Sequence, residues 1–158
     1  MQSDKFTALV RNAIGAAQSA ALAANHQKLT AEHVLAALLK DDNMTVKMLL
    51  AKAGADSASL SALLKAGLDK FPQVTGSGAG QLQLDADLAR IFAAVEAEAK
   101  ARHDQFIAVD LLLLAMTKST GSLGKILEKA GVEPAPLGAA IDEMRKGRTA
   151  DNAAAEDG

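Results

Sequence analysis

Three histidines, His26, His33 and His103, are the residues best suited to bind a metal or to transfer a proton. No two of them are four residues apart, so no single helix would present a ready pair of metal ligands. His26 and His103 fall at expected helix ends, where a protonated ring interacts favourably with the helix dipole. The chain has no cysteine, which excludes a thiol nucleophile and a cysteine-bound metal. We therefore predict no metal site and a structural role for His26 and His103.

Phosphate binding and acid–base catalysis are the other chemistries to consider. Residues 121–126 are faintly similar to a nucleotide-binding loop, but Ser119 stands where the first glycine should be and Ile126 replaces the required Ser or Thr. This segment is better interpreted as a turn that opens a helix. Asp104 and Asp110 could act as paired carboxylates, but no nucleophile or metal ligand accompanies them. The sequence therefore predicts binding rather than catalysis, with no cofactor.

The composition favours closely packed helices. Apolar residues make up 49% of the 158 residues and aromatic residues only 3%, and most of the apolar residues are the helix formers Ala and Leu. The net charge is −2, and the absence of a basic stripe argues against a nucleic-acid partner. No apolar run is long enough to cross a membrane, and the N-terminus does not resemble a signal peptide. We expect a soluble cytoplasmic domain.

Apolar residues recur at three- and four-residue steps in eight segments, which predicts eight helices. Thr30 and Asp85 are suitable N-caps for the second and fifth helices, and Gly54 and Gly131 are suitable residues to end the third and seventh. The run of four leucines at 111–114 is apolar on all sides, so the sixth helix should be buried around most of its circumference. The first helix is expected at about 5–25, the second from Thr30 to near 41–43, and the fourth at about 57–70. The third contains Val46, Leu49 and Leu50 and ends at Gly54, and the fifth begins at Asp85. The sixth is expected at 109–118, the seventh contains Leu123, Ile126 and Leu127 and ends at Gly131, and the eighth begins after Pro136 and ends near Gly147.

An internal repeat organises these helices. When the sequence is shifted by 77 residues it realigns without a gap, so that Ile14 meets Ile91, and His26 meets His103. In the same alignment, Lys-Ala-Gly at 52–54 meets Lys-Ala-Gly at 129–131. The predicted fold class is therefore all-α, built as a pseudo-two-fold repeat of two four-helix motifs that share one core.

The repeat also suggests domain boundaries. We expect one domain over residues 1–148, with a first repeat at about 5–70, a linker at 71–81 and a second repeat at about 82–147. The linker contains a Gly-rich stretch at 76–80 that lacks the GxGxxG spacing and follows no expected strand. Residues 149–158 are small, polar and acidic, which is typical of a flexible linker toward a further module.

These features resemble the N-terminal domain of the Clp ATPases. Residues 30–39 (TAEHVLAALL) resemble a helix of that family's first repeat, and Phe106-Ile107 followed by residues 110–115 (DLLLLA) resembles its second. Within the family, residues 71–78 (FPQVTGSG) are similar to the linker of the ClpB type rather than of the ClpA or ClpC type. The resemblance covers Met1 to about Arg148.

The resemblance implies a role. ClpB-type proteins are hexameric, ATP- and Mg-dependent disaggregases that work with the DnaK chaperone system, and their N-terminal domains contact unfolded or aggregated polypeptides. By resemblance, this chain is a substrate-binding domain that passes clients to an ATPase pore. It lacks the ATPase modules, so we expect it to be no enzyme, to need no cofactor itself and to be a monomer.

Five positions carry over from the family's substrate-contact surface. Thr7 and Asp104 match directly, and Asp110 stands where the family commonly has Glu. Phe92 and Leu111 correspond to apolar groove residues. Weak contacts of this kind would suit a feeder that must release its client. Phe92 and Leu111 also lie on faces that fit a core, and the three polar residues would equally suit surface, capping or ion-pairing roles.

A second function remains open for the same fold. The related ClpA and ClpC domains resemble an adaptor-docking module, which would bind one folded partner instead of unfolded chains. The linker at 71–78 favours the first interpretation. A comparison of affinity for assorted unfolded peptides with affinity for one folded adaptor would separate the two.

Overall fold

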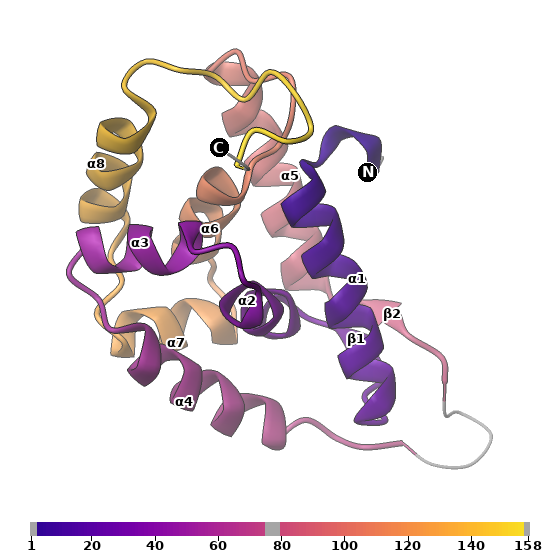
Figure 1. Cartoon of the computed structure of the whole chain (residues 1–158). Coiled ribbons are helices and arrows are strands. Elements are labelled where there is room, and N and C mark those ends of the chain that lie inside the picture. The colour runs from indigo at the N-terminus through magenta and orange to yellow at the C-terminus, as the bar shows by residue number, and fades with distance from the viewer. Residues whose placement is uncertain (1–2, 75–79, 157–158) are drawn as a thin grey trace.

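Eight α-helices form most of the computed structural model, which describes residues 3–74 and 80–156 (Figure 1). The first half begins with a 3₁₀ turn, η1 (Ser3–Lys5), and contains α1 (Ala8–Ala23), α2 (Ala31–Lys40), α3 (Thr45–Lys52) and α4 (Ser57–Asp69). The second half contains α5 (Ala86–Ala101), α6 (Val109–Thr117), α7 (Ser122–Lys129) and α8 (Pro134–Arg145). The predicted linker lies partly outside the described residues, because 75–79 are not described.

The two halves repeat one arrangement, which confirms the predicted pseudo-two-fold fold. A shift of 77 residues places α3 on α7 end to end and brings the other three pairs within one residue at each end. The contacts follow the same symmetry, since α3 packs against α8 in one place and α4 packs against α7 in another (Figure 1). The halves therefore interlock rather than stand side by side.

Local hydrogen bonds explain where the helices start. Thr30 caps α2 as predicted, because its side chain accepts a bond from the backbone of His33 while the His33 ring accepts one from the backbone of Thr30. Asp85 caps α5 through the backbone N–H of Asp87. Thr7 caps α1 through the backbone N–H of Val10.

The core surrounds α2 and α6, the second helix of each half. All four leucines at 111–114 are buried, as the sequence predicts for a helix that is apolar on every side. In α2, Leu35 and Leu38 are buried in the same cluster. Both halves thus contribute their most apolar helix to a single core.

Two short strands depart from the all-α expectation. Strand β1 (Lys28–Leu29) precedes α2 and pairs in parallel with β2 (Gln83–Leu84), which precedes α5. An equivalent bridge joins Phe6, before α1, to Ile107, before α6. The entry segment of each half therefore pairs with the other half. Two residues per strand give too short a period-two pattern to detect in a sequence.

Two predicted helix ends were wrong. Helix α8 begins at Pro134 rather than after Pro136, because proline at the first helical position loses no hydrogen bond and already has a helical φ. Helix α1 begins at Ala8 rather than near Lys5, because the preceding residues form η1 and the bridge of Phe6.

The C-terminal residues follow a defined path. We call residues 149–156 the strap, because they run back across the ends of α1, α6 and α8 in Figure 1. The Ala8 N–H donates to the Ala153 carbonyl over 2.7 Å, and Ala150 is buried. The sequence predicts a flexible tail here, and the packed conformation differs from an extended linker. None of the helices in the described residues is long and apolar enough to cross a membrane.

Candidate functional site

Arg145 joins two of the predicted site residues. Its Nε and Nη2 donate to Asp110 over 2.6 and 2.8 Å, and its Nη1 donates to Asp104 over 2.9 Å. The Asp104 side chain is fully buried, and those of Asp110 and Arg145 are 15% and 12% exposed. The bonds to Asp110, and then those to Asp104, raise the pKa of Arg145. Both predicted carboxylates are therefore paired, as one of the two sequence interpretations allowed.

Thr7 lies at the same end of the molecule and is fully buried. Its hydroxyl donates to Oε2 of Glu156 in the strap over 3.0 Å. The same Glu156 oxygen accepts the backbone N–H of Val109 over 2.8 Å. Helix α6 has no side-chain cap from its own N-cap residue, Ala108, so Glu156 supplies an acceptor at the positive end of its dipole.

These bonds bring the three polar site residues into one continuous group. Thr7 connects through Glu156 to the first residue of α6, the next residue is Asp110, and Arg145 connects Asp110 to Asp104. Local sequence patterns could not reveal Arg145 or Glu156 as the connecting residues, because each lies far along the chain from its partners.

The two predicted apolar site residues lie in the core instead. Leu111 has no exposed surface, and Phe92 is 8% exposed, with its ring centroid 5.4 Å from that of Phe6. Neither side chain is open to a partner in this conformation. Their role in substrate binding stays a prediction that would require the surrounding surface to open.

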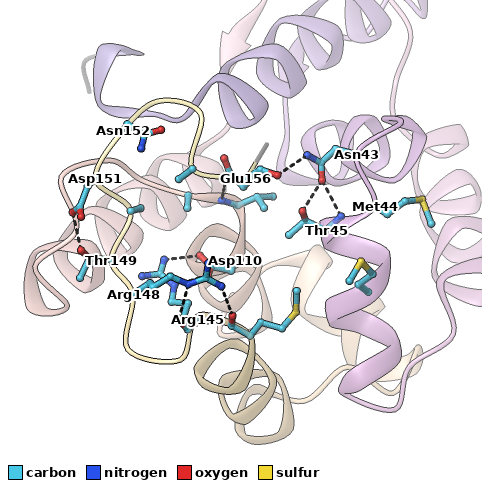
Figure 2. A pocket seen from close by; sticks show the side chains of 16 residues that line it. Asn43, Met44, Thr45, Asp110, Arg145, Arg148, Thr149, Asp151, Asn152 and Glu156 are labelled. Atoms are coloured by element: carbon cyan, nitrogen blue, oxygen red, sulfur yellow. Dashed lines mark hydrogen bonds and ion pairs between the residues drawn. The ribbon is translucent and has the colours of Figure 1, made fainter. Parts of the chain in front are cut away.

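A cleft of about 830 Å³ adjoins the polar group (Figure 2). Three methionines line it together with Asp110, Arg145 and the strap: Met44, Met48 and Met144. Met44 and Met48 are 51% and 49% exposed, which is high for large apolar side chains. Sequence reasoning missed them. The signal available was Met48 on the outer face of a helix whose Val46, Leu49 and Leu50 point inward.

Methionine suits this cleft to varied apolar partners. Its side chain is unbranched, flexible and polarizable, so one surface can adapt to several shapes. We call Arg145 and the two carboxylates that it binds, Asp104 and Asp110, the Arg145 group. This group provides polar atoms at the edge of the cleft (Figure 2). The arrangement can therefore hold an apolar peptide segment while hydrogen bonding to its backbone or polar side chains.

The histidines form a buried pair elsewhere in the fold. Nδ1 of His26 lies 2.8 Å from Nε2 of His33, and Phe71 packs beside both rings. The Nδ1 of His33 accepts the Thr30 N–H, so its Nε2 carries the proton that is donated to His26. Burial, and then the proximity of His26, lowers the pKa of His33 to about 4. His26 follows the C-terminal end of α1, as predicted, and its interaction with the helix dipole stays a prediction.

The remaining predictions about chemistry can be compared with the structure. Gly121 precedes α7, so the segment once compared with a nucleotide-binding loop is a turn and a helix start, as predicted. No group of three or more potential metal-ligating side chains occurs within residues 3–74 and 80–156.

Comparison with known proteins gives concordant matches. The family model of the Clp repeat (R) N-terminal domain matches residues 5–146. The chaperone protein ClpB of Rhizobium meliloti (strain 1021) is 43% identical over 159 residues, which cover 100% of this chain but only 18% of that protein.

Solved structures share the fold. The Hsp104 N-terminal domain from Candida albicans has a TM-score of 0.84 at 20% identity, covering 96% of this chain and 99% of that one. A complex of the ClpV N-domain with a VipB peptide has a TM-score of 0.69 at 15% identity, covering 94% and 91%.

Proposed function

Because this chain belongs to the Clp repeat N-terminal domain family, we propose that it is a non-catalytic module that binds exposed apolar segments of unfolded or aggregated polypeptides. The observation that carries the proposal is the methionine-lined cleft beside the Arg145 group. Flexible apolar side chains with paired polar groups at their edge suit ligands of no fixed sequence.

Thr7, Asp104 and Asp110 contribute indirectly in this proposal. They hold the Arg145 group and the first turn of α6 in place beside the cleft. Phe92 and Leu111 belong to the buried core cluster. We propose that the surface consists of the methionines and the Arg145 group.

The longer protein would supply the mechanical work. Since this chain matches the N-terminal region of ClpB, we propose that it delivers clients to a hexameric ATPase that uses ATP and Mg²⁺ and works with the DnaK chaperone system. A cytoplasmic location is part of the same proposal. Weak binding suits delivery, because a client held tightly would not move on to the pore.

The test is a titration of the domain with reduced, carboxymethylated α-lactalbumin, a permanently unfolded probe. We expect Met48→Gln to weaken binding about threefold or more, because an exposed apolar contact is lost. Leu22→Gln is the matched control, since Leu22 is 41% exposed and does not line the cleft. Equal loss of affinity in both variants, or no loss in either, would show that the cleft does not bind the client.

Docking of one specific partner is the second candidate. The fold neighbour solved as a ClpV N-domain complex contains a peptide from a named protein, VipB. On this alternative, the domain would bind a single peptide or folded adaptor tightly and ignore unrelated unfolded chains. Binding of several unrelated unfolded proteins with similar affinity would argue against it.

A further inference from the structure

The strap forms one side of the cleft to which the proposed function assigns client binding. Ala150 accepts the backbone N–H groups of Gln105 and Phe106 over 2.9 and 3.0 Å, and its own N–H donates to Asp104 over 3.0 Å. Ala153 accepts the N–H of Ala8. Six strap residues line the methionine cleft: Thr149, Ala150, Asp151, Asn152, Ala155 and Glu156. Two further lining residues, Asn43 and Val109, form hydrogen bonds with Glu156 of the strap.

Glu156 anchors the end of the strap. Its carboxylate bonds to Thr7 and to the N–H of Val109, and its carbonyl accepts from Asn43 Nδ2 over 3.2 Å (Figure 2). These partners come from the ends of α1, α3 and α6. The strap thus satisfies, from within the chain, the Val109 backbone donor, which a bound peptide could use instead.

The anchor is held incompletely. Oε1 of Glu156 is buried and has no hydrogen-bond partner within the described residues. Burial raises the pKa of Glu156, because removing a carboxylate from water disfavours its charged form. A buried acceptor without a partner weakens the docked state, so the strap is a contact that a competing ligand can displace.

We propose that the strap is an intramolecular competitor, which occupies the part of the client cleft beside the first residue of α6 until an unfolded segment displaces it. The inference rests on the proposed function. The displacing ligand is a peptide segment with an apolar side chain for the methionine cleft and an acceptor, such as a carbonyl or carboxylate, for the N–H of Val109. Only molecules with an undocked strap can bind a client, so the apparent affinity for the client falls in proportion to the undocked fraction.

The experiment weakens the anchor in the full chain. Affinity for reduced, carboxymethylated α-lactalbumin is measured for the parent, for Glu156→Ala and for Asp69→Ala. Asp69 is an exposed residue at the end of α4, does not line the cleft and makes the same change in charge. We expect Glu156→Ala to bind about three- to tenfold more tightly and Asp69→Ala to match the parent.

A second readout follows the strap directly. Amide hydrogen exchange at Ala8 and Gln105, whose N–H groups donate to strap carbonyls, should become faster when the parent binds the probe. If Glu156→Ala binds no better than the parent, or if these amides become more protected, the strap is not a competitor although client binding stands. If none of the three proteins binds the probe, the proposed function itself fails.

Discussion

The neutral ring of His33 makes two structural hydrogen bonds. One ring nitrogen completes the capping box of α2 and the other donates to His26. A proton on Nδ1 would remove the acceptor for the Thr30 N–H and place a charge among buried rings. At the scale of single residues, His33 is therefore an acid-sensitive point of the molecule.

Stability should therefore fall in mild acid. The pKa of His33 is lowered from 6.5 to about 4 in the folded domain, so the unfolded chain binds the extra proton between these values. The contribution is complete above about pH 6.5 and is lost as the pH falls toward 4, by up to roughly 3 kcal/mol at about 1.4 kcal/mol per pKa unit. Urea unfolding at pH 7.5 and 4.5 measures the loss.

His33→Gln provides the comparison for this prediction. The glutamine amide oxygen can still accept the Thr30 N–H in a capping box but does not titrate in this range. Its free energy of unfolding should depend less on pH than that of the parent over the same window. Parallel pH dependence in the two proteins would contradict the assignment of the loss to His33.

The sequence singled out Asp104 and Asp110 but not the residues that bond to them, for one physical reason. Asp104 and Asp110 stand out as charges beside an apolar helix, and Thr30 is recognisable because its capping partner is three residues away. Arg145, at 35 residues from Asp110, is one of many charged residues until the fold brings it there. Long-range pairing is decided by packing, and spacing along a chain does not report it.

At the scale of elements, the turn before α7 depends on one glycine. A Cβ added to Gly124 would overlap the carbonyl oxygen of Ser119, which is backbone and cannot rotate away. The same turn carries the hydrogen bond from the Ser119 hydroxyl to Asp87, so it connects α5 with α7. The close approach of Ser119 and Gly124 therefore helps to hold α5 and α7 together.

Alanine substitutions at two helical glycines should have opposite effects. We expect Gly124→Ala to destabilise the domain by about 1–3 kcal/mol, because the turn must shift to accept the methyl group. Gly138→Ala in α8, where an added Cβ meets no atom within 4 Å, should stabilise it by about 0.5–1 kcal/mol. Thermal melts of both variants test this, and stabilisation by Gly124→Ala would show that the turn is not tightly constrained.

Most helices were predictable because their signals are local. Apolar periodicity, the Thr30 and Asp85 caps and the four leucines of α6 all act within a few residues. The β1–β2 pairing was not, since it joins segments more than 50 residues apart with two residues each. The start of α8 was missed because two prolines in its first turn make the boundary ambiguous.

At the scale of the whole molecule, the halves share one core and should unfold together. Leu111 in α6 is fully buried in the cluster that also contains Leu35 of α2. Two short backbone pairings also join the halves. Strand β1, before α2, pairs with β2, before α5, and Phe6, before α1, pairs with Ile107, before α6. Within the part of the chain that the structure describes, one core cluster contains residues of both halves, so we expect neither half to keep a core when the other unfolds.

Leu111→Ala should therefore affect both halves. We expect a loss of about 2–5 kcal/mol in the free energy of unfolding, with a single transition in urea. Amide exchange of the most protected residues in α2 and α6 should accelerate by a similar factor. Loss of protection confined to the second half would show that the two repeats unfold independently.

The docked strap also shortens the chain. Its Ala153 carbonyl meets the Ala8 N–H near the start of the first helix, so the strap folds back on the domain instead of leading away from it. Released and fully extended, residues 149–156 would span roughly 26–29 Å at about 3.3–3.6 Å per residue. Where further protein follows the strap, displacement by a client would therefore lengthen the tether of the domain. Client binding and tether length would then change together, so a domain with a bound client could move farther from the rest of the protein than a domain without one.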